Sequence, residues 1–156
     1  MQYAATWPNV TLVYRASDMI LHAQGDGSYL SETKARSRAA GFIYLGSRQH
    51  NKDTLPLING PVSVFSTILK LVVCSAAEVE YGASFIELMV LRTTCNTFGY
   101  PQPTNDIQTD NACAAGIAND DINQKLSKAM DMRFHWLRDQ VRAGLLSVTW
   151  REKTIW

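Results

Sequence analysis

The 156-residue sequence lacks any apolar run of the roughly 18 residues that a membrane-spanning helix needs. Its N-terminus lacks the basic start, apolar stretch and small-residue cleavage site of a signal peptide. Cys74, Cys95 and Cys113 have no Cys or His partner at the spacing of zinc ligands. We therefore expect an intracellular protein, cytoplasmic or nuclear, with no membrane segment and with reduced, mostly buried thiols.

The sequence also has little net charge, +1, with 19% charged and 46% hydrophobic residues, a composition that suits one domain with one core. The charges are unevenly placed. Basic residues dominate 31–53 and 125–156, whereas residues 71–124 contain seven acids and a single base, Arg92. An acidic centre between basic flanks suits an enzyme that binds metal cations and phosphates. Ordinary variation in surface charge is the alternative explanation.

The first third of the chain is rich in strand signals. Residues 20–29, 41–46 and 62–67 are β-prone or alternate apolar with polar side chains, and loops separate them. This pattern predicts an antiparallel meander. Residues 1–17 contain one β-prone run, 10–14, without turn chemistry that ties it to the next strand, so we interpret them as a linker or an edge strand.

Helical periodicity begins after residue 74. Ser75 and Glu78 have the spacing of a capping box, which gives Glu78 a local role at the start of a helix. The helix should be largely buried, and its expected apolar stripe is Val79, Ala83, Ile86 and Val90.

The remaining elements alternate between strand and helix. We expect a strand at 106–110, a short helix at 111–119, a long helix at 124–143 ended by Gly144, and a strand at 145–150. The complete order is three strands, a helix, a strand, two helices and a strand. That order predicts an α/β fold with a mixed sheet.

Three carboxylates lie where secondary structure gives them no obvious role. Asp26 lies in a predicted strand, Glu80 in the first turns of a mostly buried helix, and Asp110 at the end of a strand. Strand ends in an α/β sheet are common ligand sites, and carboxylate oxygens are preferred Mg²⁺ ligands. The three could converge on a pair of metal ions. Each also has an ordinary alternative: a turn residue, a surface acid and a helix N-cap, respectively.

Four blocks together carry a resemblance to a known family. They are GDGSYLSETKARSRAAGFIYLG (25–46), STILKLVVCSAAEVEYGA (66–83), NDIQTDNACAAGIAND (105–120) and SKAMDMRFHWLRDQV (127–141). Over most of its length the chain resembles the ribonuclease H domain of copia-type retrotransposons, and the blocks occur in the family's order.

The resemblance implies a ribonuclease H-like mixed sheet, three antiparallel strands followed by parallel ones, flanked by helices. It also implies an enzyme that uses two Mg²⁺ (or Mn²⁺) ions to hydrolyse the RNA strand of RNA–DNA hybrids. The family's metal-binding carboxylates fall on Asp26 in GDGSY, Glu80 in AAEVEY and Asp110 in TDN. Residues 1–17 then correspond to a tail from the neighbouring reverse transcriptase domain of a polyprotein, and 18–156 to the ribonuclease H-like domain.

Two departures from the family affect the expected activity. Glycines flank Asp26 on both sides, which loosens the strand that must orient it. The family also continues into a helix that supplies a fourth carboxylate, whereas here only residues 151–156 follow the last strand. We expect that helix to be missing and hybrid cleavage to be weak, with a non-catalytic nucleic-acid-binding or structural relic as the alternative. Asp131 could substitute, although a pair with His135 is its more ordinary role.

Overall fold

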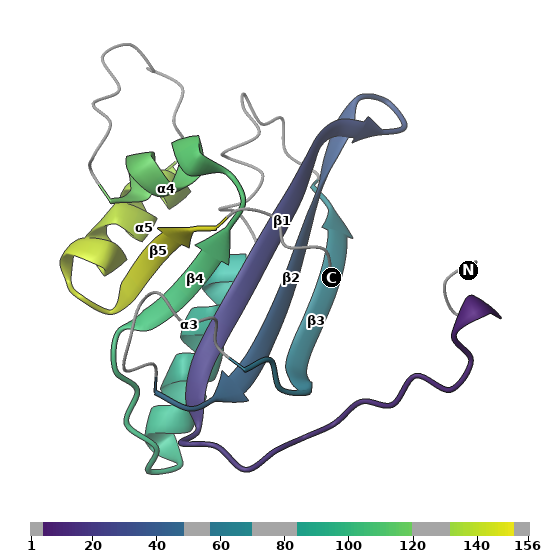
Figure 1. Cartoon of the computed structure of the whole chain (residues 1–156). Helices are drawn as coiled ribbons and strands as arrows, with labels where there is room; N and C mark the ends of the chain where they lie inside the picture. The colour runs from purple at the N-terminus through teal and green to yellow at the C-terminus, as the bar shows by residue number, and fades with distance from the viewer. Residues whose placement is uncertain (1–4, 49–56, 70–83, 120–131, 152–156) are drawn as a thin grey trace.

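The computed structural model describes residues 5–48, 57–69, 84–119 and 132–151. Its centre is a five-stranded sheet of order β3-β2-β1-β4-β5 (Figure 1). The strands are β1 (Ile20–Glu32), β2 (Arg36–Gly46), β3 (Pro61–Ile68), β4 (Asn105–Thr109) and β5 (Leu146–Trp150). The pairs β1–β2 and β2–β3 are antiparallel, while β1–β4 and β4–β5 are parallel. The predicted mixed sheet is therefore confirmed.

Three described helices pack on one face of this sheet: α3 (Ser84–Thr97), α4 (Ala112–Ala118) and α5 (Met132–Arg142). Side chains alternate between the two faces of a strand, so every second residue faces the helices. The core joins Phe85 and Leu88 of α3 and Leu137 of α5 to the sheet. The strands contribute Leu21, Ala23, Ile43, Ile107, Leu146 and Val148. These residues form the apolar face of the sheet.

The predicted apolar stripe of the first long helix is wrong where the structure describes it. Val90 is 61% exposed, whereas Phe85, Leu88 and Arg92 are buried. The buried stripe of α3 thus includes the charged residue Arg92. A prediction from hydrophobic periodicity assigns charged residues to the solvent-exposed face of a helix. The capping pair Ser75 and Glu78 lies outside the described residues.

Left-handed glycines end two of the helices. After α5, Gly144 has φ +69°, and the amides of Gly144 and Leu145 donate to the carbonyls of Val141 and Gln140 at 2.9 and 3.0 Å. Gly99 closes α3 with the same bonding pattern at φ +84°. This is the Schellman arrangement, in which glycine avoids the steric cost of a left-handed Cβ. The predicted helix end at Gly144 is confirmed.

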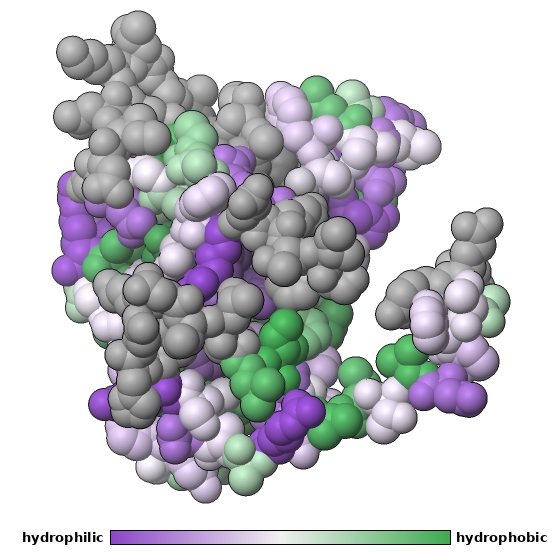
Figure 2. All heavy atoms as spheres, in the orientation of Figure 1, coloured by the Kyte–Doolittle hydropathy of each residue, from purple (hydrophilic) through white to green (hydrophobic). Residues whose placement is uncertain are grey.

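The N-terminal arm, defined here as residues 7–19, contains no strand and no helix. It is attached to the sheet where the Gly60 amide donates to the Val13 carbonyl at 2.9 Å and the Tyr14 hydroxyl donates to the Pro61 carbonyl at 3.1 Å. Exposed apolar side chains follow the arm away from the body of the molecule (Figure 2). The edge-strand interpretation of this run is therefore wrong for the described residues, and the linker interpretation stays a prediction.

Two further findings concern the cysteines and the membrane. Cys95 is half-buried, but Cys113 is exposed, so the expectation of mostly buried thiols is wrong for Cys113. Cys74 lies outside the described residues. In the described part of the chain, no helix is long and apolar enough to cross a membrane.

The turn at Gly144 gives a stability prediction. Gly144→Ala should lower the free energy of unfolding by about 1–2 kcal/mol, because a Cβ is strained at positive φ. In a domain of this size that corresponds to a fall in Tm of roughly 2–8 °C by calorimetry. Gly144→Asn is the matched control and should lose less, since Asn tolerates the left-handed region. Equal losses in the two variants would contradict the role given to backbone conformation.

Candidate active site

The register of β1 on β4 determines which side chains meet at the strand ends. Ala23 pairs with Ile107 and Gln24 with Gln108, and the Gln24 Nε2 donates to the Gln108 Oε1 at 3.3 Å. Continued for two more residues along each strand, the same register would align Asp26 with Asp110, the residue that follows β4. Adjacent strands lie about 4.8 Å apart, so continued pairing would make the two backbones neighbours. Figure 1 shows β1 beside β4.

Both carboxylate residues are exposed there. Asp110 follows β4 directly, and its carbonyl accepts a hydrogen bond from the Trp150 Nε1 at 3.1 Å, which ties it to β5. The N-cap of α4 is the next residue, Asn111, whose Oδ1 accepts from the Ala114 amide at 3.0 Å. The capping role considered for Asp110 therefore belongs to Asn111.

The other predicted ligand is not placed. Glu80 lies outside the described residues, as does the substitute Asp131. Within the described ranges, no group of three or more His, Cys, Asp and Glu side chains is close enough to hold a metal ion. The observed pairing of β1 with β4 ends two residues before Asp26 and Asp110. Their convergence and their role as metal ligands therefore stay predictions.

A third acid in this part of the sheet has a structural role. The Asp106 Oδ1 accepts hydrogen bonds from the hydroxyls of Ser147, at 3.1 Å, and Thr149. Both partners lie on the neighbouring strand β5. Because residues 106 and 108 alternate with the core residue Ile107, Asp106 lies on the sheet face opposite the helices. We call this the polar face.

A buried aromatic pair lies on the same polar face. The rings of His22 and Tyr44 stack with centroids 5.3 Å apart, and the His22 Nε2 lies 3.2 Å from the Ser47 carbonyl oxygen. Burial lowers the pKa of His22, and the Ser47 carbonyl and the Asp106 charge oppose that shift. Burial, followed by the Asp106 charge, raises the pKa of Tyr44 to about 12. The His22 ring is therefore neutral near pH 7.

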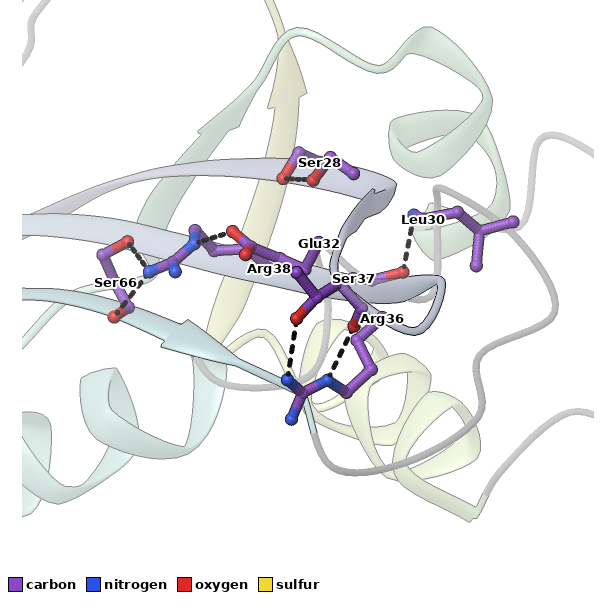
Figure 3. Close-up of polar contacts among 9 residues, drawn as sticks. Ser28, Leu30, Glu32, Arg36, Ser37, Arg38 and Ser66 are labelled. Carbon is purple, nitrogen blue, oxygen red and sulfur yellow. Dashed lines mark hydrogen bonds and ion pairs between the residues drawn. The ribbon is translucent and has the colours of Figure 1, made fainter.

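A β-hairpin extends past the end of the β1–β4 ladder (Figure 3). The Arg38 Nε forms a 2.6 Å ion pair with the Glu32 Oε1, and its Nη1 donates to the Ser66 Oγ at 3.1 Å. The Arg36 Nε donates to the Thr33 carbonyl at 3.1 Å. The Arg38 guanidinium thus links β2 to β1 and β3, and the Arg36 guanidinium links β2 to the hairpin turn.

No family model matches the chain. The chain is 24% identical over 140 residues to the Retrovirus-related Pol polyprotein from transposon TNT 1-94 of Nicotiana tabacum. The match covers 88% of the chain and 10% of that polyprotein, so the chain spans about a tenth of the relative's length.

Solved structures of ribonucleases H share the fold. The RNase H1 of Halobacterium salinarum matches with a TM-score of 0.50 and 14% identity over 86% of each chain. LC11-RNase H1, isolated from compost, matches with a TM-score of 0.59 and 10% identity over 86% of each chain. The same enzyme in complex with an RNA/DNA hybrid gives 0.58 and 8%, over 85% of this chain and 86% of the other.

The chain therefore has a ribonuclease H-like fold. The sequence similarity to a transposon polyprotein agrees with it, so the predicted resemblance to the ribonuclease H domain of a retrotransposon polyprotein is confirmed.

The buried histidine gives a prediction for pH. The pKa of His22 is lower in the folded chain than its ordinary value of 6.5. The fold is therefore most stable, with respect to this residue, at pH values above 6.5, and it loses stability as the pH falls below 6.5. The reason is that the unfolded chain takes up a proton while the buried ring stays neutral. Urea unfolding at about pH 7.5 and about pH 5.5 should show this loss.

His22→Phe is the control, because it keeps a ring against Tyr44 but cannot be protonated. Its free energy of unfolding should change less between the two pH values than that of the wild-type chain. An unchanged pH dependence in the variant would exclude His22 as the source.

Proposed function

We propose that this chain is the ribonuclease H domain of a copia-type retrotransposon polyprotein, and that it hydrolyses the RNA strand of RNA–DNA hybrids. The observation that carries the proposal is the parallel pairing of β1 with β4 at Ala23–Ile107 and Gln24–Gln108, because the same register, continued by two residues, would align Asp26 with Asp110. Both residues occur in blocks that resemble the family, and both are exposed.

The carboxylate oxygens of the proposed ligands suit Mg²⁺ or Mn²⁺. Both ions prefer oxygen ligands, and Mg²⁺ is held by one or two protein carboxylates together with substrate phosphates and water. Asp26 and Asp110, joined by Glu80, would hold the ions. Two bound ions supply charge that activates a water and stabilises the leaving oxygen of a phosphodiester.

Neighbouring strands hold the backbone at Asp110 and Asp26 in place. The Trp150 indole and the strand β5 hold the backbone at Asp110, and β2 pairs with β1 as far as Asp26 and beyond, with Asp26 opposite Ala40. Pairing with β2 limits the freedom that the glycines on either side of Asp26 introduce. Both carboxylates are therefore presented from strands that are hydrogen-bonded to a neighbour.

The proposed partner is an RNA–DNA hybrid, within a polyprotein that also carries a reverse transcriptase. LC11-RNase H1, which shares the fold, has been solved in complex with such a hybrid. In this chain Lys34 and Arg36 are exposed at the end of the β1–β2 hairpin. Positive side chains on an exposed hairpin favour binding of a phosphate backbone.

The proposal predicts different effects on cleavage for substitutions of two neighbouring acids, Asp110 and Asp106. Asp110→Asn should reduce cleavage of a labelled RNA–DNA hybrid, with Mg²⁺ or Mn²⁺, to the level seen without protein. The reason is that an amide cannot supply the charge a metal site requires. A gel assay measures the cleavage.

Asp106→Asn is the matched control, because its carboxylate is bound by hydroxyls of β5. It should lower thermal stability and retain cleavage at temperatures where the variant is folded. Equal loss of cleavage in the two variants would contradict a metal-binding role that belongs to Asp110 and not to Asp106. A wild-type chain that binds hybrid but does not cleave it would favour the inactive relic over the enzyme.

A further inference from the structure

We infer that Asn105 and Gln102, held by Arg92, are positioning residues that set the register of β4 on β1 and so place Asp110 beside Asp26. The structural part of the inference concerns the strands alone. Its consequence for metal binding rests on the proposed function.

Two side chains hold both backbone groups of one residue in β1. The Leu21 amide donates to the Gln102 Oε1 at 2.9 Å, and the Leu21 carbonyl accepts from the Asn105 Nδ2 at 2.9 Å. Asn105 is the first residue of β4, and Leu21 lies two residues before Ala23, where the backbone pairing with β4 begins. These side chains therefore fix β1 against the start of β4 next to the ladder.

The orientation of the two amides is determined by their partners. The Asn105 Oδ1 accepts from the Arg92 guanidinium, which can only donate, so the Nδ2 must face the Leu21 carbonyl. The Gln102 Nε2 donates to the carbonyls of Met19, at 2.8 Å, and Tyr100, at 3.1 Å. Its Oε1 is left to accept from Leu21 and from the Asn105 Nδ2, at 3.2 Å.

Arg92 holds Gln102 and Asn105 from the side opposite Leu21. It is 8% exposed, and its guanidinium donates to the carbonyls of Gln102, at 2.9 Å, and Pro103, as well as to Asn105. Burial lowers the pKa of Arg92, but an Arg remains charged in proteins and needs these acceptors. The contacts hold the segment between α3 and β4 in one conformation.

Register matters here because the direct ladder between β1 and β4 is short. It joins Ala23 to Ile107 and Gln24 to Gln108. A slip by one residue moves β4 by about 3.3 Å and turns its side chains to the opposite face. Such a slip would separate the carboxylates of Asp26 and Asp110 while leaving each strand intact.

The test uses Asn105→Asp. The carboxylate keeps an acceptor for Arg92, but its second oxygen faces the carbonyl oxygen of Leu21 and repels it. The matched control is Asn119→Asp, which removes the same kind of bond, an amide donating to the Val148 carbonyl of β5 at 2.7 Å. Gln102→Glu, which loses the donors to Met19 and Tyr100, is the second variant if Asn105→Asp does not fold.

Two readouts are needed. The first is the set of interstrand NOEs between Gln24 and Gln108, which reports register without metal. The second is the affinity for Mn²⁺ measured by electron paramagnetic resonance. In Asn105→Asp the NOEs should weaken or shift, and Mn²⁺ affinity should fall roughly 10- to 100-fold, as for residues that orient metal ligands. Asn119→Asp should retain both.

Unchanged NOEs in a folded Asn105→Asp or Gln102→Glu variant would overturn the inference. So would equal losses of Mn²⁺ affinity in Asn105→Asp and Asn119→Asp. If the wild-type chain binds no Mn²⁺ and cleaves no hybrid, the proposed function fails, and the NOEs alone decide whether these residues set the register.

Discussion

The pair of hydrogen bonds that Asn105 and Gln102 make to Leu21 is the constraint on which the candidate site depends. Each is buried, and losing one would leave a polar group unsatisfied in the interior, which costs about 1–3 kcal/mol. The Arg92 guanidinium donates to the Asn105 Oδ1 and to the main-chain carbonyl of Gln102, and so holds both residues in place. The position of Asp110 relative to Asp26 therefore follows from contacts at the opposite end of the strands.

The sheet divides the chain's chemistry between its two faces. One face packs against the described helices through aliphatic side chains of every strand except β3. The polar face carries His22, Tyr44, Gln24 and Gln108, together with the hydroxyls that bind Asp106. Alternation along β1 puts Asp26 on the same face as Gln24. The proposed cation and nucleic-acid chemistry would thus take place on the face opposite the packed core.

The strands, the mixed sheet and the helix end at Gly144 could be predicted, because alternation and turn glycines are local signals. Asp26 and Asp110 could be singled out because secondary structure gives them no obvious role and because both occur in the family blocks. The register could not, since it depends on Gln102 and Asn105 in a polar, proline-containing segment with no periodicity. The burial of Arg92 could not be predicted either, because a buried charge is recognised only from its acceptors.

The most direct test of the central claim, that Asp26 and Asp110 share one metal site, is paramagnetic broadening of backbone amide resonances by Mn²⁺. The account predicts that the amides of Gly27 and Asn111 broaden together, at the same low Mn²⁺ concentration, and that added Mg²⁺ restores both. Broadening of one amide without the other, or of neither while distant acids respond, would contradict it.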